Sequence, residues 1–334
     1  MKKRILALVC ACVLLVLAIF TGCSGQANDD GTYPYRIGIL QLFDHPALDA
    51  AREGFVGRLA EHGFQEGENV VFVVRNAQMD MSIATQMAEY LVEQDPHLIL
   101  SIATGASQAV ARATQDNPIP VVITAVTDPL TAELVESLER PGRNVTGVSD
   151  LTPVAMQIEL ITRLLPDTQT VGLLYNSGEI NSVIQANMAR EAAAALGFET
   201  ITGNVPSMAD VADVIQSLVG RVCVLYLPTC NTVAGAYPTV IMAADEAGIP
   251  VVAGEVAGVR AGALATEGID YYLLGRQSAD MAVQLLQGEA VPATMPIQWQ
   301  QEAGTLAVNI ASAERLGITI PPEILNAAGE IVEE

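Results

Sequence analysis

Lysine is almost missing from this chain of 334 residues. The only two copies, Lys2 and Lys3, stand at the very start, and all basic residues after Arg4 are arginines. This absence excludes a P-loop nucleotide site, a pyridoxal Schiff base and a lysine general base, because each needs a lysine side chain. The 38 acidic residues and the formal net charge of −22 also argue against a nucleic-acid partner, since phosphate contacts are built from Lys and Arg.

Cysteine is scarce as well. Of the five cysteines, three fall in the first 23 residues, which leaves Cys223 and Cys230. Along one predicted strand and its exit these two would lie about 20 Å apart, too far for a disulfide. Neither has a CxxC or CxxH neighbour, so we expect no metal site, with Cys223 in the core and Cys230 at a strand end.

Only three histidines are present: His45, His62 and His97. No GxSxG, HExxH or paired Cys and His array accompanies them, so the chain lacks the motifs of the common hydrolases. We therefore expect no catalytic residue and no cofactor. An exported hydrolase that works with carboxylates alone is the least favoured alternative.

The first residues are typical of an export signal. Three basic residues precede the apolar run Ile5 to Phe20, which is short for a membrane span, and small residues lead to Cys23. This end resembles a bacterial lipobox, which implies removal of residues 1–22 and lipidation of Cys23, followed by a flexible tether over 23–35. We expect an exported protein, lipid-anchored on the outer face of the cytoplasmic membrane. An uncleaved N-terminal anchor would leave the domain on the same side.

The stretch RIGILQLFDHPALDAAREG, from Arg36 to Gly54, sets the plan for the rest. An apolar run long enough for one buried strand ends in a polar break, and Pro46 then suits the first position of a helix. In open α/β sheets, ligands bind where strands end and helices begin. Gln41, Asp44 and His45 are therefore the first site candidates.

Strands and helices then alternate with short breaks, which predicts parallel sheets covered by helices on both faces. The pattern restarts after Gly147, and this indicates two similar lobes rather than a single large sheet. We expect strands at 36–43, 70–74, 97–103, 119–126, 171–175, 198–204, 222–227 and 250–253. We expect helices from Pro46 onward and at 83–92, 104–114, 128–140, 153–165, 180–196, 209–219, 231–247 and 271–287.

Polar side chains are dense at the predicted strand ends. Each of them could simply cap the helix that follows, but together they lie at the same edge of two sheets. The helix start at Thr104 to Ser107 presents backbone N–H groups and hydroxyls that suit a carboxylate. Asp150 and Glu255 could hold the matching ammonium group, or both could be solvated surface acids.

Six segments resemble the ABC transporter substrate-binding lipoproteins of the tryptophan/tyrosine uptake type. The likeness runs from about Tyr35 to the C-terminus. Its segments are QLFDHPALDAAREGF (41–55), AVTDP (125–129), PGRNVTGVSDLTPV (141–154), LLYNSGEINS (173–182), NTV (231–233) and ATEGIDYYLLGRQSADMA (265–282).

The resemblance implies a type I periplasmic-binding-protein fold, with two doubly wound α/β lobes joined by three crossovers that close on a ligand. It places the crossovers near 149–152, near 266–270 and after Gln287. Lobe one would then be residues 36–149 plus 268–288, and lobe two 150–267 plus 289–334. An Asp is common in this family where Cys230 stands, and this departure argues against a polar ligand contact from that position and for a shifted ligand preference.

The leading hypothesis is capture of a free α-amino acid, aromatic in kind, for an ABC permease and ATPase encoded separately, by a monomer. Alternatives are a nucleoside or sugar as ligand, or a ligand sensor that reports to a membrane receptor. The ligand's carboxylate would be bound by Thr104, Ser107 and Thr127, and its amine by Asp150 or Glu255. The polar edge of the ligand would be bound by Gln41 and His45. The full expected set is Gln41, His45, Thr104, Gly105, Ser107, Thr127, Asp128, Asp150, Tyr175, Asn176, Asn181, Thr229, Asn231, Glu255 and Asp270.

Overall fold

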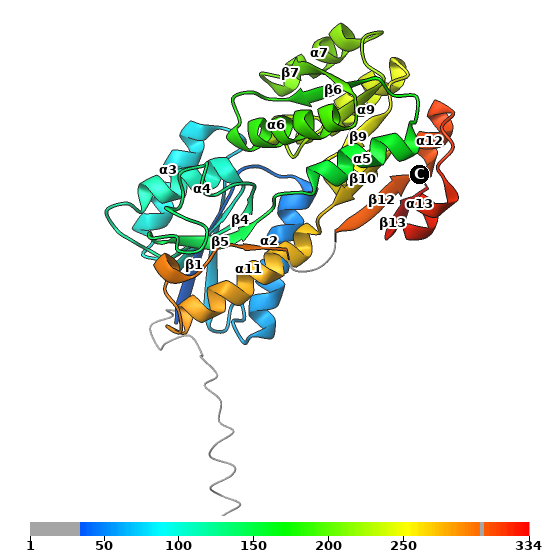
Figure 1. The fold of residues 1–334 in the computed structure, drawn as a ribbon. Coiled ribbons are helices and arrows are strands. Elements are labelled where there is room, and N and C mark those ends of the chain that lie inside the picture. Colours follow the sequence, from blue (N-terminus) through cyan, green and yellow to red (C-terminus); the bar gives the residue numbers. More distant parts are fainter. Residues whose placement is uncertain (1–33, 301–303, 334) are drawn as a thin grey trace, which may run out of the picture.

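The chain forms two lobes, each built on one sheet (Figure 1). The structure is a computed structural model that describes residues 34–300 and 304–333. The expected export signal, Cys23 and nearly all of the tether lie outside the described residues. Within those two ranges, no helix has both the length and the apolar character needed to cross a membrane.

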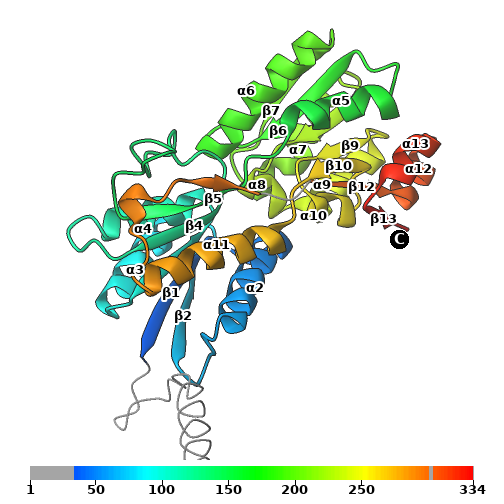
Figure 2. The ribbon, with the colours of Figure 1, turned by 60° about the horizontal axis from the view of Figure 1, so that its bottom comes forward.

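Lobe one contains a sheet in which every neighbouring pair of strands is parallel. Helices α2 and α11 pack together on one face, and α3 and α4 pack together on the other (Figure 2). The sheet order is β11-β5-β4-β3-β1-β2. Its elements are β1 (Tyr35–Gln41), α2 (Pro46–Glu61), β2 (Val70–Asn76), α3 (Met81–Glu93), β3 (Leu98–Ile102), α4 (Thr104–Ala113), β4 (Val121–Val126), β5 (Val145–Ser149), α11 (Tyr271–Leu286) and β11 (Gln298–Trp299).

Lobe two repeats this plan and adds two strands at one edge, of which β12 runs antiparallel to β10. The sheet order is β13-β12-β10-β9-β8-β6-β7. Its elements are α5 (Val154–Leu164), β6 (Thr170–Tyr175), α6 (Ile180–Ala195), β7 (Glu199–Asn204), α7 (Val211–Leu218), β8 (Val224–Leu227), α8 (Asn231–Ala234), α9 (Tyr237–Glu246), β9 (Val251–Ala253), α10 (Val256–Arg260), β10 (Ala265–Gly268), β12 (Thr305–Asn309), α12 (Ile310–Leu316), α13 (Pro322–Ala327) and β13 (Glu330–Val332).

The same strand order appears in both lobes: β2-β1-β3-β4-β5 in the first and β7-β6-β8-β9-β10 in the second. In each case the first strand of the set lies between the second and the third, so the direction of winding reverses beside it. Ligand sites of open α/β sheets lie outside the carboxyl ends of strands at such a reversal. The two reversals therefore mark one ligand-binding edge on each lobe.

The chain passes between the lobes three times: after β5, after β10 and after β11. This arrangement confirms the expected type I fold. The third passage corrects the expected boundary, because β11 pairs with β5 and residues as far as Trp299 belong to the sheet of lobe one. The step to lobe two therefore comes after Trp299 rather than after Gln287.

Two predicted helices were wrong. Residues 128–140 form consecutive turns, fixed by the Asp128 carboxylate, which accepts bonds from the N–H groups of Leu130 and Thr131. The helix expected at 231–247 is divided into α8 and α9 at Gly235 and Ala236, and a proline lies in the first turn of α9. The short strand β5 and the short helix α10 were not predicted, and Cys223 is exposed rather than in the core.

Helices α2 and α11 touch backbone to backbone. A Cβ added at Gly54 would lie 2.1 Å from the Tyr272 carbonyl oxygen, and one at Gly275 would lie 1.9 Å from the Ala51 carbonyl oxygen. On the solvent side, two ion pairs join α2 and α11: one from Arg58 to Asp280 and one from Arg276 to Glu61. A helix from late in the sequence is thus fixed firmly into lobe one.

Candidate functional site

Two chambers lie between the lobes, at the carboxyl ends of the strands. They share Asn181 and Asn231 as a common wall. The inner chamber is lined by Phe43, His45, Leu48, Ala125, Thr127, Asp150, Asn181, Thr229, Cys230, Asn231, Ala234, Glu255 and Tyr271. The outer chamber is lined by Leu42, Met79, Met81, Thr104, Gly105, Gln108, Asn176, Gly178, Glu179, Ile180, Asn181, Asn231 and Thr232.

Asp150 follows β5 and is buried in the wall of the inner chamber. Its Oδ1 accepts a hydrogen bond from the Thr127 hydroxyl (3.0 Å), and its Oδ2 accepts one from the Tyr271 hydroxyl (2.8 Å). Burial raises the pKa of this carboxyl to about 6; the hydroxyls of Tyr271 and Thr127 oppose the rise and the charge of Glu255 adds to it. Among the residues that line the chamber there is no arginine to balance Asp150.

Glu255 follows β9 and brings a second buried carboxylate from lobe two. Its Oε1 accepts a hydrogen bond from the Tyr237 hydroxyl (2.7 Å) and lies 3.8 Å from His45 Nε2, which is too long for a hydrogen bond. His45 caps α2 through Nδ1, so its Nε2 is buried without a hydrogen-bond partner. A buried polar atom without a partner is costly, and one that faces a chamber suits a ligand contact.

Gln185 of α6 bonds the two lobes together directly. Its amide nitrogen donates to the Thr127 hydroxyl of lobe one (3.2 Å) and to the hydroxyl of Thr229. Its amide oxygen accepts from the Thr152 hydroxyl (3.1 Å). Thr127 thus contacts both Asp150 and Gln185, and this arrangement requires the lobes to be close together.

The outer chamber contains the start of α4. This helix has Ala103 at its N-cap position, which offers no capping side chain, so its first N–H groups receive no side-chain oxygen. Thr104 and Gly105 of this first turn line the chamber. With the positive end of the helix dipole behind them, these N–H groups suit a carboxylate.

The start of α8 on lobe two is already occupied. The Glu179 carboxylate accepts bonds from the N–H groups of Asn231 (2.9 Å) and Thr232 (2.8 Å), and from the Asn231 amide and the Thr232 hydroxyl. Glu179 was not among the predicted residues, although it stands four residues after the end of β6. Its position fixes the lobe-two wall of the outer chamber.

Ten of the fifteen expected residues line one or both of the two chambers. His45, Thr127, Asp150, Thr229 and Glu255 line the inner chamber; Thr104, Gly105 and Asn176 line the outer; Asn181 and Asn231 line both. Asp270 lines neither chamber: it borders a separate pocket lined by α2 and α10, where it caps α11 through the N–H groups of Tyr272 and Leu273.

Besides Asp270, four other expected residues line neither chamber, and their side chains have other partners. The Gln41 amide bonds to Phe43, Asp49 and Arg52, and the Ser107 hydroxyl bonds to Ser101 and to the Ala103 carbonyl. Asp128 caps its own turn, and the Tyr175 hydroxyl accepts from Arg190. The carboxylate role expected of Ser107 and the ligand-edge role expected of Gln41 are therefore not supported by the geometry.

Cys230 lies in the wall of the inner chamber, where burial raises the pKa of its thiol to about 12. The thiol is therefore neutral near pH 7 and a poor nucleophile. Within residues 34–300 and 304–333, His, Cys, Asp and Glu side chains form no group of three that could hold a metal ion.

Backbone strain gathers beside the chambers. Met79, Ala103 and Ala125 have φ of 62°, 80° and 56°, values that residues with a side chain rarely adopt. Ala125 lies at an irregularity in the pairing of β4 with β5, and Ala103 precedes α4 directly. Such conformations cost free energy and gather at functional sites.

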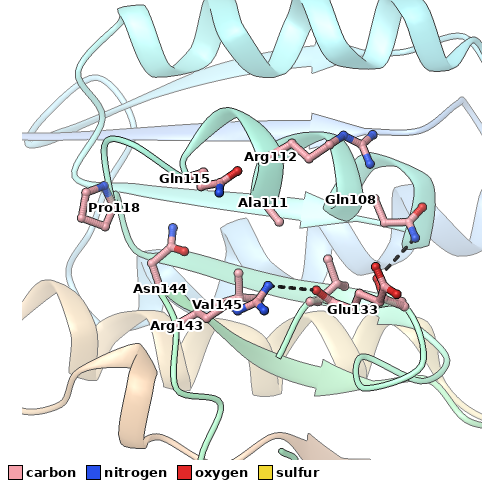
Figure 3. Close-up of a pocket in the computed structure, with 11 residues that line it drawn as sticks. Gln108, Ala111, Arg112, Gln115, Pro118, Glu133, Arg143, Asn144 and Val145 are labelled. Atoms are coloured by element: carbon pink, nitrogen blue, oxygen red, sulfur yellow. Dashed lines mark hydrogen bonds between the residues drawn. The ribbon is translucent and has the colours of Figure 1, made fainter. Parts of the chain in front are cut away.

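A larger pocket, of about 610 Å³, lies on lobe one beside α4 (Figure 3). One side is α4, with Arg112, and the residues just after it, with Gln115; the other is the loop that ends in Arg143 and Asn144. The Arg143 side chain bonds to the Glu133 carbonyl, and the Gln108 amide to the Ala132 carbonyl. Lobe two contributes no residue to this pocket, so the interlobe chambers remain the candidate site.

Known proteins that are similar to this chain are also ligand-binding proteins. A "Tyrosine-binding protein" of Clostridioides difficile (strain R20291) is 39% identical over 299 residues, which cover 87% of this chain and 86% of that protein. An ABC domain from Streptococcus pneumonia, solved in complex with L-Trp, is 37% identical with a TM-score of 0.86, and the match covers 89% of this chain and 99% of that one.

A ligand-free, open structure of a substrate-binding protein with adhesive properties from Clostridium difficile is 40% identical. The match covers 90% of this chain and 100% of that one, but the TM-score is only 0.70. The present structure therefore superposes more closely on the L-Trp complex than on the open form. The family model described as "ABC transporter substrate binding protein" matches residues 36–332. This chain belongs to the ABC transporter substrate-binding proteins.

Proposed function

We propose that this protein captures a free aromatic α-amino acid between its lobes and delivers it to an ABC permease. The observation that carries the proposal is the pair of buried carboxylates, Asp150 and Glu255, in a chamber that no arginine lines. Two buried charges of one sign are unfavourable until a cation joins them. An ammonium group supplies that charge, and the uncapped start of α4 receives the carboxylate of the same ligand.

The relatives support the aromatic preference, since one is named for tyrosine and another was solved with L-Trp. Export, a lipid anchor at Cys23 and a monomeric state complete the proposal, together with a permease and an ATPase on separate chains. The anchor would keep the binding protein beside its permease on the outer face of the cytoplasmic membrane.

A thermal-shift screen tests the proposal. Protein freed of carried-over ligand is heated with each of the twenty amino acids, with nucleosides and with sugars. A ligand at 100 times its dissociation constant adds about 2.7 kcal/mol to stability, which raises Tm by several degrees. We expect tryptophan, tyrosine and phenylalanine to produce this shift. A shift with a nucleoside or a sugar and with no amino acid would contradict the proposal.

Acid should weaken binding. The raised pKa of Asp150, about 6, means that this carboxyl takes up a proton as the pH falls through 6, and a neutral carboxyl holds an ammonium group poorly. We expect affinity for L-tryptophan to be level from pH 7 to 8 and about tenfold weaker at pH 5, as measured by calorimetry. The ligand keeps its own charges over this range. Equal affinity at pH 5 and pH 7.5 would show that Asp150 does not bind the ammonium group.

The stability of the ligand-free protein should depend on pH in the opposite direction. Between pH 4 and 6 the folded state holds a proton on Asp150 that the unfolded state has lost, so this group's contribution to stability decreases as the pH rises through that window. With an ammonium group bound, the ionised form of Asp150 is favoured, so the contribution of this group to stability increases as the pH rises. The gain in Tm from L-tryptophan should therefore grow from pH 5 to pH 7.5.

A further inference from the structure

The outer chamber is large enough for an aromatic ring, and the inner chamber is not. Their free volumes are about 300 Å³ and about 20 Å³. A cavity of about 150 Å³ holds one benzene molecule, whereas about 15 Å³ holds a single water. With the lobes in this arrangement, the inner chamber accepts a small polar group such as an ammonium, and a ring must lie in the outer chamber.

Flexible apolar side chains of lobe one cover part of the outer chamber. Leu42 follows β1, Met79 lies in the corner between β2 and α3, and Met81 is the first residue of α3. Backbone bonds hold this corner to the end of β1: the Ala77 N–H donates to the Gln41 carbonyl, and the Met79 N–H to the Leu42 carbonyl. The left-handed backbone of Met79 is thus fixed at the chamber wall, while 43% of Met81 remains exposed at its edge.

Gly105 keeps this space open. A Cβ at this position would lie 3.0 Å from the Met81 sulfur and 3.4 Å from Leu42 Cδ1. The absence of a side chain leaves the start of α4 accessible and leaves both apolar side chains room to pack on a ligand. The opposite wall, on lobe two, is held in place by the bonds of Glu179.

We propose that the outer chamber holds the side chain of the bound amino acid, and that Met79 and Met81 give the preference for an aromatic ring over a small side chain. This inference rests on the proposed function, because it takes the ligand to be an amino acid whose ammonium group lies between Asp150 and Glu255. It then assigns the position of that ligand's ring. Thioether sulfur makes favourable contacts with aromatic rings, and methionine adapts its shape to rings of different size. Indole and phenol rings therefore both fit.

The test uses the double variant Met79→Ala/Met81→Ala and calorimetry with L-tryptophan, L-tyrosine and L-alanine, with competition against L-tryptophan where binding is weak. We expect affinity for both aromatic ligands to fall about tenfold, with L-alanine changed by less than about twofold. The matched control is Met156→Ala/Met242→Ala, two methionines of lobe two that are 52% and 57% exposed and line neither chamber. We expect the control to bind all three ligands like the parent protein.

A volume-conserving variant distinguishes a loss of contact with the ligand from a loss of folding. Met79→Leu/Met81→Leu keeps the apolar wall, so we expect it to recover most of the affinity for L-tryptophan, while Tm without ligand confirms that each variant is folded. Equal weakening of alanine and tryptophan, or no weakening of either, would place the ring elsewhere and overturn the inference alone. Failure of the parent protein to bind any amino acid would overturn the proposed function and this inference together.

Discussion

Replacing Asp150 with asparagine is expected to weaken L-tryptophan binding at least about 30-fold at pH 7.5. Removing one partner of a buried, hydrogen-bonded charge pair costs about 2 kcal/mol or more, which corresponds to that factor. Asparagine has nearly the same size; its amide oxygen can still accept from one of the two hydroxyls of Thr127 and Tyr271, and its NH2 group can donate to the other. The expected loss is therefore one of charge rather than of shape, and calorimetry measures it directly.

The ligand-free form of this variant should be at least as stable as the parent protein. Asparagine removes a buried negative charge that stands near Glu255 without a cation, so Tm without ligand should stay level or rise. The control is Asp116→Asn, which removes a charge from an exposed position outside both chambers. Unchanged affinity in Asp150→Asn would exclude this carboxylate as the ammonium site, and Glu255→Gln would be measured next.

Replacing Gly275 with alanine is expected to destabilise the protein by about 3 kcal/mol and to lower Tm by roughly 6 °C. The new Cβ would lie 1.9 Å from the Ala51 carbonyl oxygen, which is backbone and cannot rotate away, so α2 and α11 must separate. Thermal and denaturant unfolding measure the loss. Because Tyr271 at the start of α11 bonds to Asp150, affinity for the ligand should also decrease.

The matched control is Gly57→Ala on α2, the partner helix of α11. There a Cβ would meet only the Tyr272 hydroxyl at 3.6 Å, an ordinary contact, and alanine favours the helix over glycine by about 1 kcal/mol. We expect Gly57→Ala to be neutral or slightly stabilising. If the two substitutions changed stability equally, helix preference rather than the close contact of α2 with α11 would determine the change in stability.

The fold could be predicted because its strands are apolar runs with short polar breaks, and the restart after Gly147 revealed the second lobe. Sequence patterns predicted the structure less well in segments whose conformation is determined by tertiary contacts. The segment 128–140 has helical residue types, with Pro129 as its second residue and Pro141 directly after it. The buried Leu134 and Val135, together with the left-handed backbone of Glu133, hold it in turns. β5 is short and contains Gly147, where a Cβ would lie 2.1 Å from the Ile123 carbonyl oxygen of β4.

The candidate site was only partly predictable for a similar reason. Residue types at strand ends identified Asp150, Glu255, His45 and Thr104, because the carboxyl ends of parallel strands share one edge. The sequence does not show which of these polar side chains turn inward, so Ser107 was expected to contact the ligand although its hydroxyl bonds to Ser101. Met79 and Met81 were missed because only the folded chain brings them and residues of lobe two to the same chamber.

The path of the chain between the lobes also determines when each lobe can be completed. The sheet of lobe one ends with β11, and α11 packs on β4 and β5, so the N-terminal lobe needs residues made long after residue 150. A nascent or truncated chain that stops near residue 268 would leave the apolar face under α11 uncovered, and such faces promote aggregation. The lobes are therefore not consecutive folding units, and the first can reach its native packing only after nearly all of the second has been synthesised.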